Sequence, residues 1–97
     1  MIHVGLYYDV KPGQEKKFEE IFGAVKSSLG REEGFISGTL YRNVDRPNSY
    51  MILSEWSSLE HFKKFVASNS FRRVAESGKE ILEREPRNRV FTESLSS

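Results

Sequence analysis

The order in which the apolar spacing changes along this chain constrains its fold more than any other feature. A period of two, typical of a strand, occurs four times, at residues 2–10, 34–44, 50–56 and 85–93. A helical period occupies 14–30 and, with a break at 68–70, the stretch 57–82. The predicted order is therefore strand, helix, strand, strand, helix, strand.

This order is typical of the α+β ferredoxin-like βαββαβ fold, in which a four-stranded antiparallel sheet carries its helices on one face. We expect one domain over residues 1–93 and a polar tail at 94–97. Ser57 with Glu60 predicts a capping box at the start of the second helix, and Ser70 predicts a cap after the break.

Both faces of this sheet carry large apolar residues. Ile2, Val4, Leu6 and Tyr8 are predicted to face the helices, and Tyr7 the opposite side. Because a monomer would expose the second face, we expect a homodimer packed sheet on sheet. The register of the second strand decides whether that face also carries Phe35 and Tyr41 or Ile36 and Leu40. The register of the third strand decides between Met51 with Leu53 and Tyr50 with Ile52.

Composition excludes several classes of function. Without cysteine there is no disulfide, Cys-ligated metal or thiol catalysis, and two distant histidines form no metal constellation. A net charge of +1 gives no general attraction to nucleic acid, and the aromatic-glycine signature of RNA-binding sheets is missing. The chain shows no membrane span and no secretory leader, so we expect a cytoplasmic location and no membrane partner.

The stretch "SEWSSLEHFKKFVASNSFRRV" resembles the antibiotic biosynthesis monooxygenase (ABM) domain family, in which a Trp ends the third strand and a Ser-x-x-Phe step follows the next helix. "KPGQEKKFEEIF" and "EEGFISGTLYRN" are similar to the same family, so the resemblance covers about residues 2–93. It implies a dimeric α+β barrel with a pocket between sheet and helices in each protomer.

The family that the chain resembles contains members of two known chemistries and others with no assigned chemistry. Some members oxygenate polycyclic phenols or quinols with O₂ and neither metal nor flavin, and others degrade haem. The haem-degrading members place an Asn, an aromatic residue and a His at positions that correspond here to Leu6, Phe65 and Ala75. Because leucine cannot hydrogen-bond and alanine cannot ligate iron, we do not expect classical haem degradation.

A cofactor-free oxygenase needs an apolar pocket for a flat substrate and a base or donor that favours its phenolate. Trp56 is a candidate to stack on the substrate and to donate through its indole N–H, and Tyr8 and Arg72 are candidate donors. The alternatives are a core anchor for Trp56, core or interface packing for Tyr8 and a surface salt bridge for Arg72. The expected pocket lining is Leu6, Phe22, Phe62, Phe65 and Phe71.

Three functions follow from these residues. The first is a cofactor-independent monooxygenase acting with O₂ on an aromatic or quinol-type small molecule. The second is a small-ligand-binding or structural module without turnover, which the lack of an evident base favours. The third is haem binding without degradation, for which His3, His61 and the tyrosines are the candidate axial ligands. In the first two, no metal or other cofactor is expected.

Overall fold

A computed structural model describes residues 1–95 and contains the predicted elements in the predicted order. A short 3₁₀ turn, η1, follows the last helix. The bounds are β1 Ile2–Asp9, α1 Glu15–Leu29, β2 Phe35–Arg42, β3 Ser49–Trp56, α2 Leu59–Val66, α3 Asn69–Gly78, η1 Lys79–Ile81 and β4 Arg87–Thr92. The polar tail predicted at 94–97 lies partly outside the described residues.

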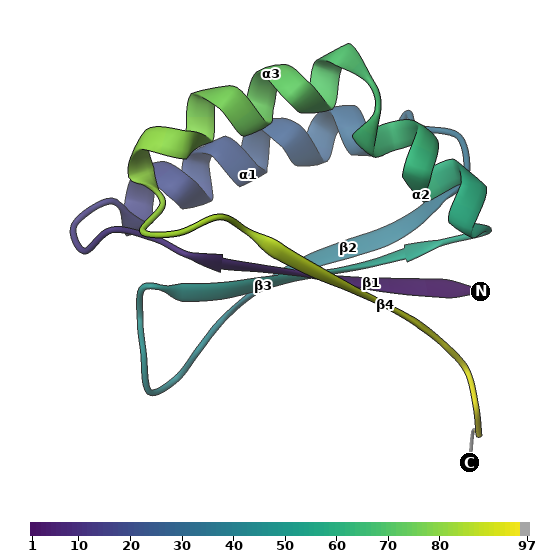
Figure 1. Ribbon diagram of the computed structural model, residues 1–97, viewed down its shortest axis with the longest axis horizontal. Helices are drawn as coiled ribbons and strands as arrows, with labels where there is room; N and C mark the ends of the chain where they lie inside the picture. The colour runs from purple at the N-terminus through teal and green to yellow at the C-terminus, as the bar shows by residue number, and fades with distance from the viewer. Residues whose placement is uncertain (96–97) are drawn as a thin grey trace.

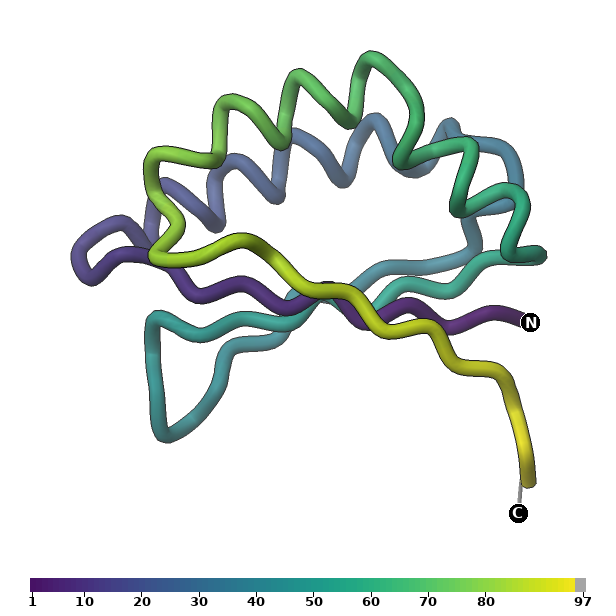
Figure 2. The backbone as a smooth tube through the Cα atoms, in the orientation of Figure 1, coloured from purple at the N-terminus to yellow at the C-terminus, as the bar shows by residue number. Residues whose placement is uncertain are grey.

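The four strands form one antiparallel sheet in the order β2-β3-β1-β4, which confirms the ferredoxin-like fold. All three helices lie on one side of this sheet, and the β2–β3 hairpin projects away from them (Figure 1). Helices α1 and α3 are in contact and run side by side over the sheet (Figure 2). No helix within residues 1–95 is long and apolar enough to cross a membrane.

The core between sheet and helices consists of two clusters. One is built around Trp56 with Val4, Leu29, Phe62 and Phe65, and the other joins Val10, Phe18, Tyr50 and Ile81. Helix α3 has no buried residue, although its apolar side carries the half-buried Phe71 and Val74. The sheet is thus packed firmly at both ends and more loosely in the middle.

The two predicted helix caps are wrong by one or two residues. Ser58, not Ser57, caps α2, because its Oγ accepts from the His61 backbone N–H at 3.3 Å. The Ser57 N–H instead donates to the Gly34 carbonyl. Ser68, not Ser70, caps α3 and accepts from the Phe71 N–H at 3.2 Å. In a run of serines, spacing alone does not fix which one has the extended backbone that a cap requires.

A β-bulge settles which side of the sheet each residue of β2 faces. The register shifts between Phe35 and Ser37, so Phe35 pairs with Trp56 and Leu40 with Ile52 on the helix side, while Tyr41 lies opposite Met51 on the outer side. Strict alternation assigns either Phe35 with Tyr41 or Ile36 with Leu40 to the outer face. One residue of each pair, Phe35 and Leu40, is on the helix side instead, because a bulge exchanges the two faces of a strand. The outer face carries Tyr7, Tyr41, Met51, Leu53 and Phe91.

Candidate active site

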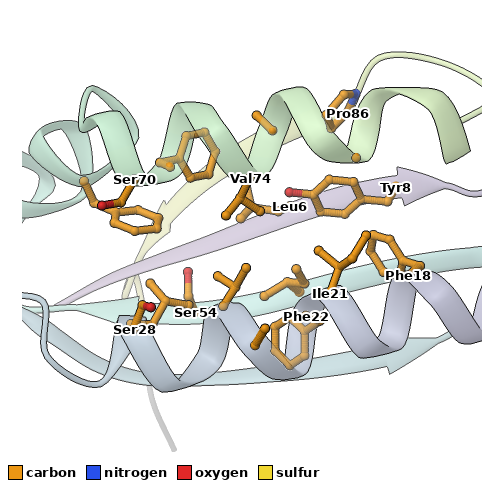
Figure 3. Close-up of a pocket in the computed structure, with 18 of the residues that line it drawn as sticks. Leu6, Tyr8, Phe18, Ile21, Phe22, Ser28, Ser54, Ser70, Val74 and Pro86 are labelled. Carbon is orange, nitrogen blue, oxygen red and sulfur yellow. The ribbon is translucent and has the colours of Figure 1, made fainter.

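A cavity of about 800 Å³ lies between the sheet and helices α1 and α3. Its floor is formed by side chains of β1 and β3, and its walls by the two helices (Figure 3). The volume is in the range of small-molecule sites, and most of the lining is apolar. The cavity explains why the middle of the sheet lacks a tightly packed core.

Strand register determines what the floor presents. Alternate residues of β1 and β3 face the helices, so Leu6 lies opposite Ile52 and Val4 opposite Ser54. Leu6, Ile52, Ser54 and Trp56 line the cavity as a result. The walls and roof include all four phenylalanines expected there from the sequence, Phe22, Phe62, Phe65 and Phe71.

Trp56 is both a core residue and part of the cavity wall. It is 1% exposed and packs at ring-centroid distances of 5.4–5.7 Å against Phe35, Phe62 and Phe65. Its Nε1–H donates to Ser54 Oγ at 3.1 Å. The indole donor is therefore engaged within the protein, and what remains for a ligand is the apolar ring.

Tyr8 offers the cavity its phenol group. The ring packs against Phe18 at 5.2 Å, and the hydroxyl points toward the middle of the cavity (Figure 3). No described residue forms a hydrogen bond with this hydroxyl. Burial raises the pKa of Tyr8, so the group stays protonated at neutral pH and is a hydrogen-bond donor.

A group of serines lies at the end of the cavity away from Tyr8. Ser28 of α1, Ser54 of β3 and Ser70 of α3 gather there (Figure 3). Sequence reasoning missed them, because isolated serines on helices and strands carry no pattern. The mouth residues Lys79, Arg84 and Glu85 were also missed.

Arg72 is not where the sequence placed it. It is exposed and lines a shallow surface groove with Asn69, Arg73, Glu76 and Ser77, separate from the cavity. A donor role for Arg72 inside the cavity is therefore wrong. Side chains at positions i and i+1 of a helix point in different directions. Because Phe71 of α3 points into the cavity, the next residue, Arg72, points away from it.

Neither histidine reaches the cavity. On the outer face, His3 Nε2 lies 2.6 Å from Glu93 Oε2, and this hydrogen bond is the main reason that the pKa of Glu93 falls to about 2. His61 Nδ1 lies 2.7 Å from Ser58 Oγ at the start of α2. Within residues 1–95, no group of three or more His, Cys, Asp or Glu side chains is arranged to hold a metal ion.

Comparison with known families identifies the fold and the lineage. The model of the antibiotic biosynthesis monooxygenase family matches residues 1–77. The chain belongs to this family. The ABM domain superposes with a TM-score of 0.86 on the crystal structure of SnoaB, a cofactor-independent oxygenase from Streptomyces nogalater, at 23% identity, covering 98% of this chain and 94% of that one.

Sequence relatives of this ABM domain carry two kinds of name. A "putative heme-binding protein" from Natronomonas pharaonis is 34% identical over 85 residues, which is 88% of this chain and 14% of that protein. Deoxynogalonate monooxygenase from Streptomyces nogalater is 30% identical over 59 residues, 61% of this chain and 50% of that protein. The chain thus spans about a seventh of the first relative and half of the second.

The cavity of this ABM domain does not fit haem ligation. Axial ligands to haem iron come from His, Cys, Met or Tyr, and among the lining residues only Tyr8 is of these types. Burial raises the pKa of Tyr8 and so disfavours the phenolate that iron requires. Leu6, Phe65 and Ala75, the positions that correspond to the haem-degrading set, all line the cavity and none can ligate iron.

Proposed function

We propose that this ABM domain is a cofactor-independent monooxygenase that acts with O₂ on a flat aromatic or quinol-type molecule. The observation that carries the proposal is the largely apolar cavity of about 800 Å³, into which the Tyr8 phenol points with no hydrogen-bond partner among residues 1–95. Such a cavity would take a polycyclic substrate and exclude water from its reacting carbon. The Tyr8 hydroxyl would orient the substrate by one of its oxygens.

The chemistry requires little from the protein. An ionised phenol or enol transfers one electron to O₂, the resulting pair recombines at carbon as a peroxide, and loss of water leaves a carbonyl. For an anthrone, the sum is substrate plus O₂ giving quinone plus water. A hydrogen bond from Tyr8 stabilises the substrate oxyanion, and the Trp56 ring supplies a rigid apolar wall.

Aerobic turnover of anthrone or a naphthoquinol tests the proposal. Oxygen uptake is measured with and without the protein, so that autoxidation can be subtracted. We expect acceleration that depends on Tyr8 and saturates with substrate. Trp56 fluorescence shows whether the two substrates bind. If both bind and oxygen uptake stays at the autoxidation rate, the oxygenase is ruled out.

The second candidate is ligand binding without turnover. It is favoured by the engagement of the Trp56 N–H with Ser54 and by the position of Arg72 outside the cavity. Of the three donors predicted from the sequence, only Tyr8 then offers a free group inside. The binding module is distinguished by quenching of Trp56 fluorescence with no oxygen consumed. Haem is not the expected ligand, and a haem titration should leave the Soret band unshifted.

We further infer that the working unit is a homodimer. The outer face of the sheet carries Tyr41 and Phe91, which are 48% and 51% exposed, beside Tyr7, Met51 and Leu53. No helix within residues 1–95 covers this face (Figure 1). A second copy packed sheet on sheet would bury it by two-fold symmetry.

A further inference from the structure

Two tyrosines connect the cavity to the surface of the domain. Tyr8 on β1 and Tyr50 on β3 are cross-strand partners with their side chains on the same face. The ring of Phe18 from α1 packs against both, at centroid distances of 5.2 and 4.8 Å. Tyr8 lines the cavity, whereas Tyr50 is 3% exposed and does not line it.

The hydroxyl of Tyr50 has a partner that Tyr8 lacks. It donates to Glu19 Oε2 at 2.6 Å, the short distance of a hydrogen bond to a carboxylate. The Glu19 side chain is 46% exposed, and Arg42 lies 3.8 Å from it. An oxidisable ring in the core is thus hydrogen-bonded to a carboxylate in contact with solvent.

This difference determines where an oxidised ring is most stable. One-electron oxidation makes a phenol a strong acid, so a tyrosine gives up its electron readily only where its proton has an acceptor. Tyr50 has the Glu19 carboxylate. No described residue accepts from Tyr8, and the N–H of Trp56 faces the neutral hydroxyl of Ser54, which is a weak base. A radical formed at the cavity is therefore drawn toward Tyr50.

We propose that Tyr8, Tyr50 and Glu19 form a redox relay that carries oxidising equivalents out of the cavity to the ring of Tyr50, and the released proton through Glu19 to the surface. The proposal rests on the proposed oxygenase for its oxidant. This oxidant is superoxide that takes up the proton lost by the substrate and escapes the substrate pair as a hydroperoxyl radical. This radical takes a hydrogen atom from the Tyr8 hydroxyl and becomes hydrogen peroxide. The relay would thus protect the cavity lining from oxidation during turnover.

The remaining steps conserve electrons and protons. Tyr50 passes one electron to the Tyr8 radical, and the Tyr8 oxygen takes up one proton from bulk solvent and becomes a phenol again, which balances the proton that Tyr50 releases. The hydroxyl proton of Tyr50 moves to Glu19 and from there to solvent. A thiolate in solution then reduces the Tyr50 radical, which takes back a proton, and a thiyl radical is left outside the protein.

Pulse radiolysis tests the relay without any substrate. Azide radicals oxidise tryptophan and tyrosine directly, and tandem mass spectrometry of the digested protein then measures the products at Tyr8, separately from Tyr7. The main variant is Glu19→Gln, which keeps an oxygen acceptor for the Tyr50 hydroxyl but removes the basic carboxylate. Tyr50→Phe removes the relay ring, and Tyr41→Phe is the matched control at a tyrosine on the outer face of the sheet, away from the cavity.

We expect oxidation at Tyr8 to rise roughly tenfold in Glu19→Gln and in Tyr50→Phe, and to be unchanged in Tyr41→Phe. Added thiol should protect Tyr8 in the wild type and not in Glu19→Gln. Equal Tyr8 oxidation in the wild type and Glu19→Gln would overturn the relay. Because no substrate is present in this experiment, that result would not contradict the proposed oxygenase. Conversely, a positive radiolysis result together with no turnover of anthrone would refute the oxygenase alone.

Discussion

The indole nitrogen of Trp56 donates a hydrogen bond to Ser54 Oγ, two residues earlier on β3, at 3.1 Å. Ser54 Oγ in turn donates to the Val4 carbonyl at 3.3 Å, so the pair is tied to the neighbouring strand. Both side chains are nearly fully buried and both line the cavity. The orientation of the one tryptophan is thus set by a serine, and the ring rather than its N–H faces a ligand.

Replacement of Ser54 by alanine tests this arrangement. The indole N–H would be left buried without a partner, which should lower the free energy of unfolding by about 1–3 kcal/mol. Urea unfolding followed by the fluorescence of Trp56 measures both the stability and the ring environment. Ser28→Ala, which alters another cavity serine, is the control and should change neither by a comparable amount. Equal effects from the two variants would show that the Ser54 bond does not position Trp56.

Removal of the Tyr8 hydroxyl tests the site chemistry. Tyr8→Phe keeps the ring and its packing on Phe18 but removes the donor that points into the cavity. We expect enzyme-dependent oxygen uptake with anthrone to fall roughly 100-fold, since single oxyanion donors have effects of this size. Tyr7→Phe, the same change one residue away on the opposite face, should retain activity. If both variants turn over at the wild-type rate, Tyr8 is only a packing residue.

The fold could be predicted from the sequence because its signals are local and agree with one another. Period-two strands and two amphipathic stretches in a fixed order leave few topologies for a chain of this length. The bulge at Phe35 and the choice of cap among Ser57, Ser58, Ser68 and Ser70 could not be predicted. Both depend on backbone angles that tertiary packing selects.

Site residues could be predicted from the sequence where its periodicity shows which face of a strand or helix a side chain is on. Tyr8 and Leu6 followed from strand alternation, and Phe62 and Phe65 from the helical stripe. The prediction for Arg72 was wrong because Arg72 and its neighbour Phe71 differ in the direction in which their side chains leave the helix. The relay between Tyr8 and Tyr50 could not be anticipated either, since strand pairing joins residues 42 positions apart. Chemical roles for these residues stay predictions.

A charge on the outer face of the sheet tests the homodimer. Leu53→Glu would place a carboxylate in the centre of that face, where a sheet-on-sheet contact would bury it unpaired. We expect light scattering at micromolar concentration to report a dimer for the wild type and a monomer for the variant. Val44→Glu, in the exposed β2–β3 connection, should stay dimeric. A monomeric mass for the wild type itself would contradict the inference.

Gly34 is a position at which adding a single Cβ atom should lower the stability of the fold. Its φ of +84° is in the left-handed region, and a Cβ there would overlap the ring of His61. Gly34→Ala should therefore cost roughly 2 kcal/mol or more in stability, from backbone strain and displacement of that ring. Gly13→Ala also has a positive φ but meets nothing within 4 Å, so it isolates the strain from the clash. Thermal unfolding of both variants separates the two contributions, and equal losses would show that His61 moves away freely.

The Tyr50–Glu19 contact makes a prediction about alkaline pH. Burial, followed by the hydrogen bond to Glu19, raises the pKa of Tyr50 from 10.0 to about 12. Between these values the unfolded chain has released the proton and the folded protein still holds it, so stability should fall as pH rises from 10 to 12, by roughly 2 kcal/mol. Urea unfolding at pH 9 and pH 11.5 measures this loss. In Tyr50→Phe the fall should be smaller by that amount, and in Tyr41→Phe it should equal the wild type. A fall of the same size in all three proteins would mean that Tyr50 ionises as freely in the folded state as in the unfolded chain, and that its bond to Glu19 does not hold the proton.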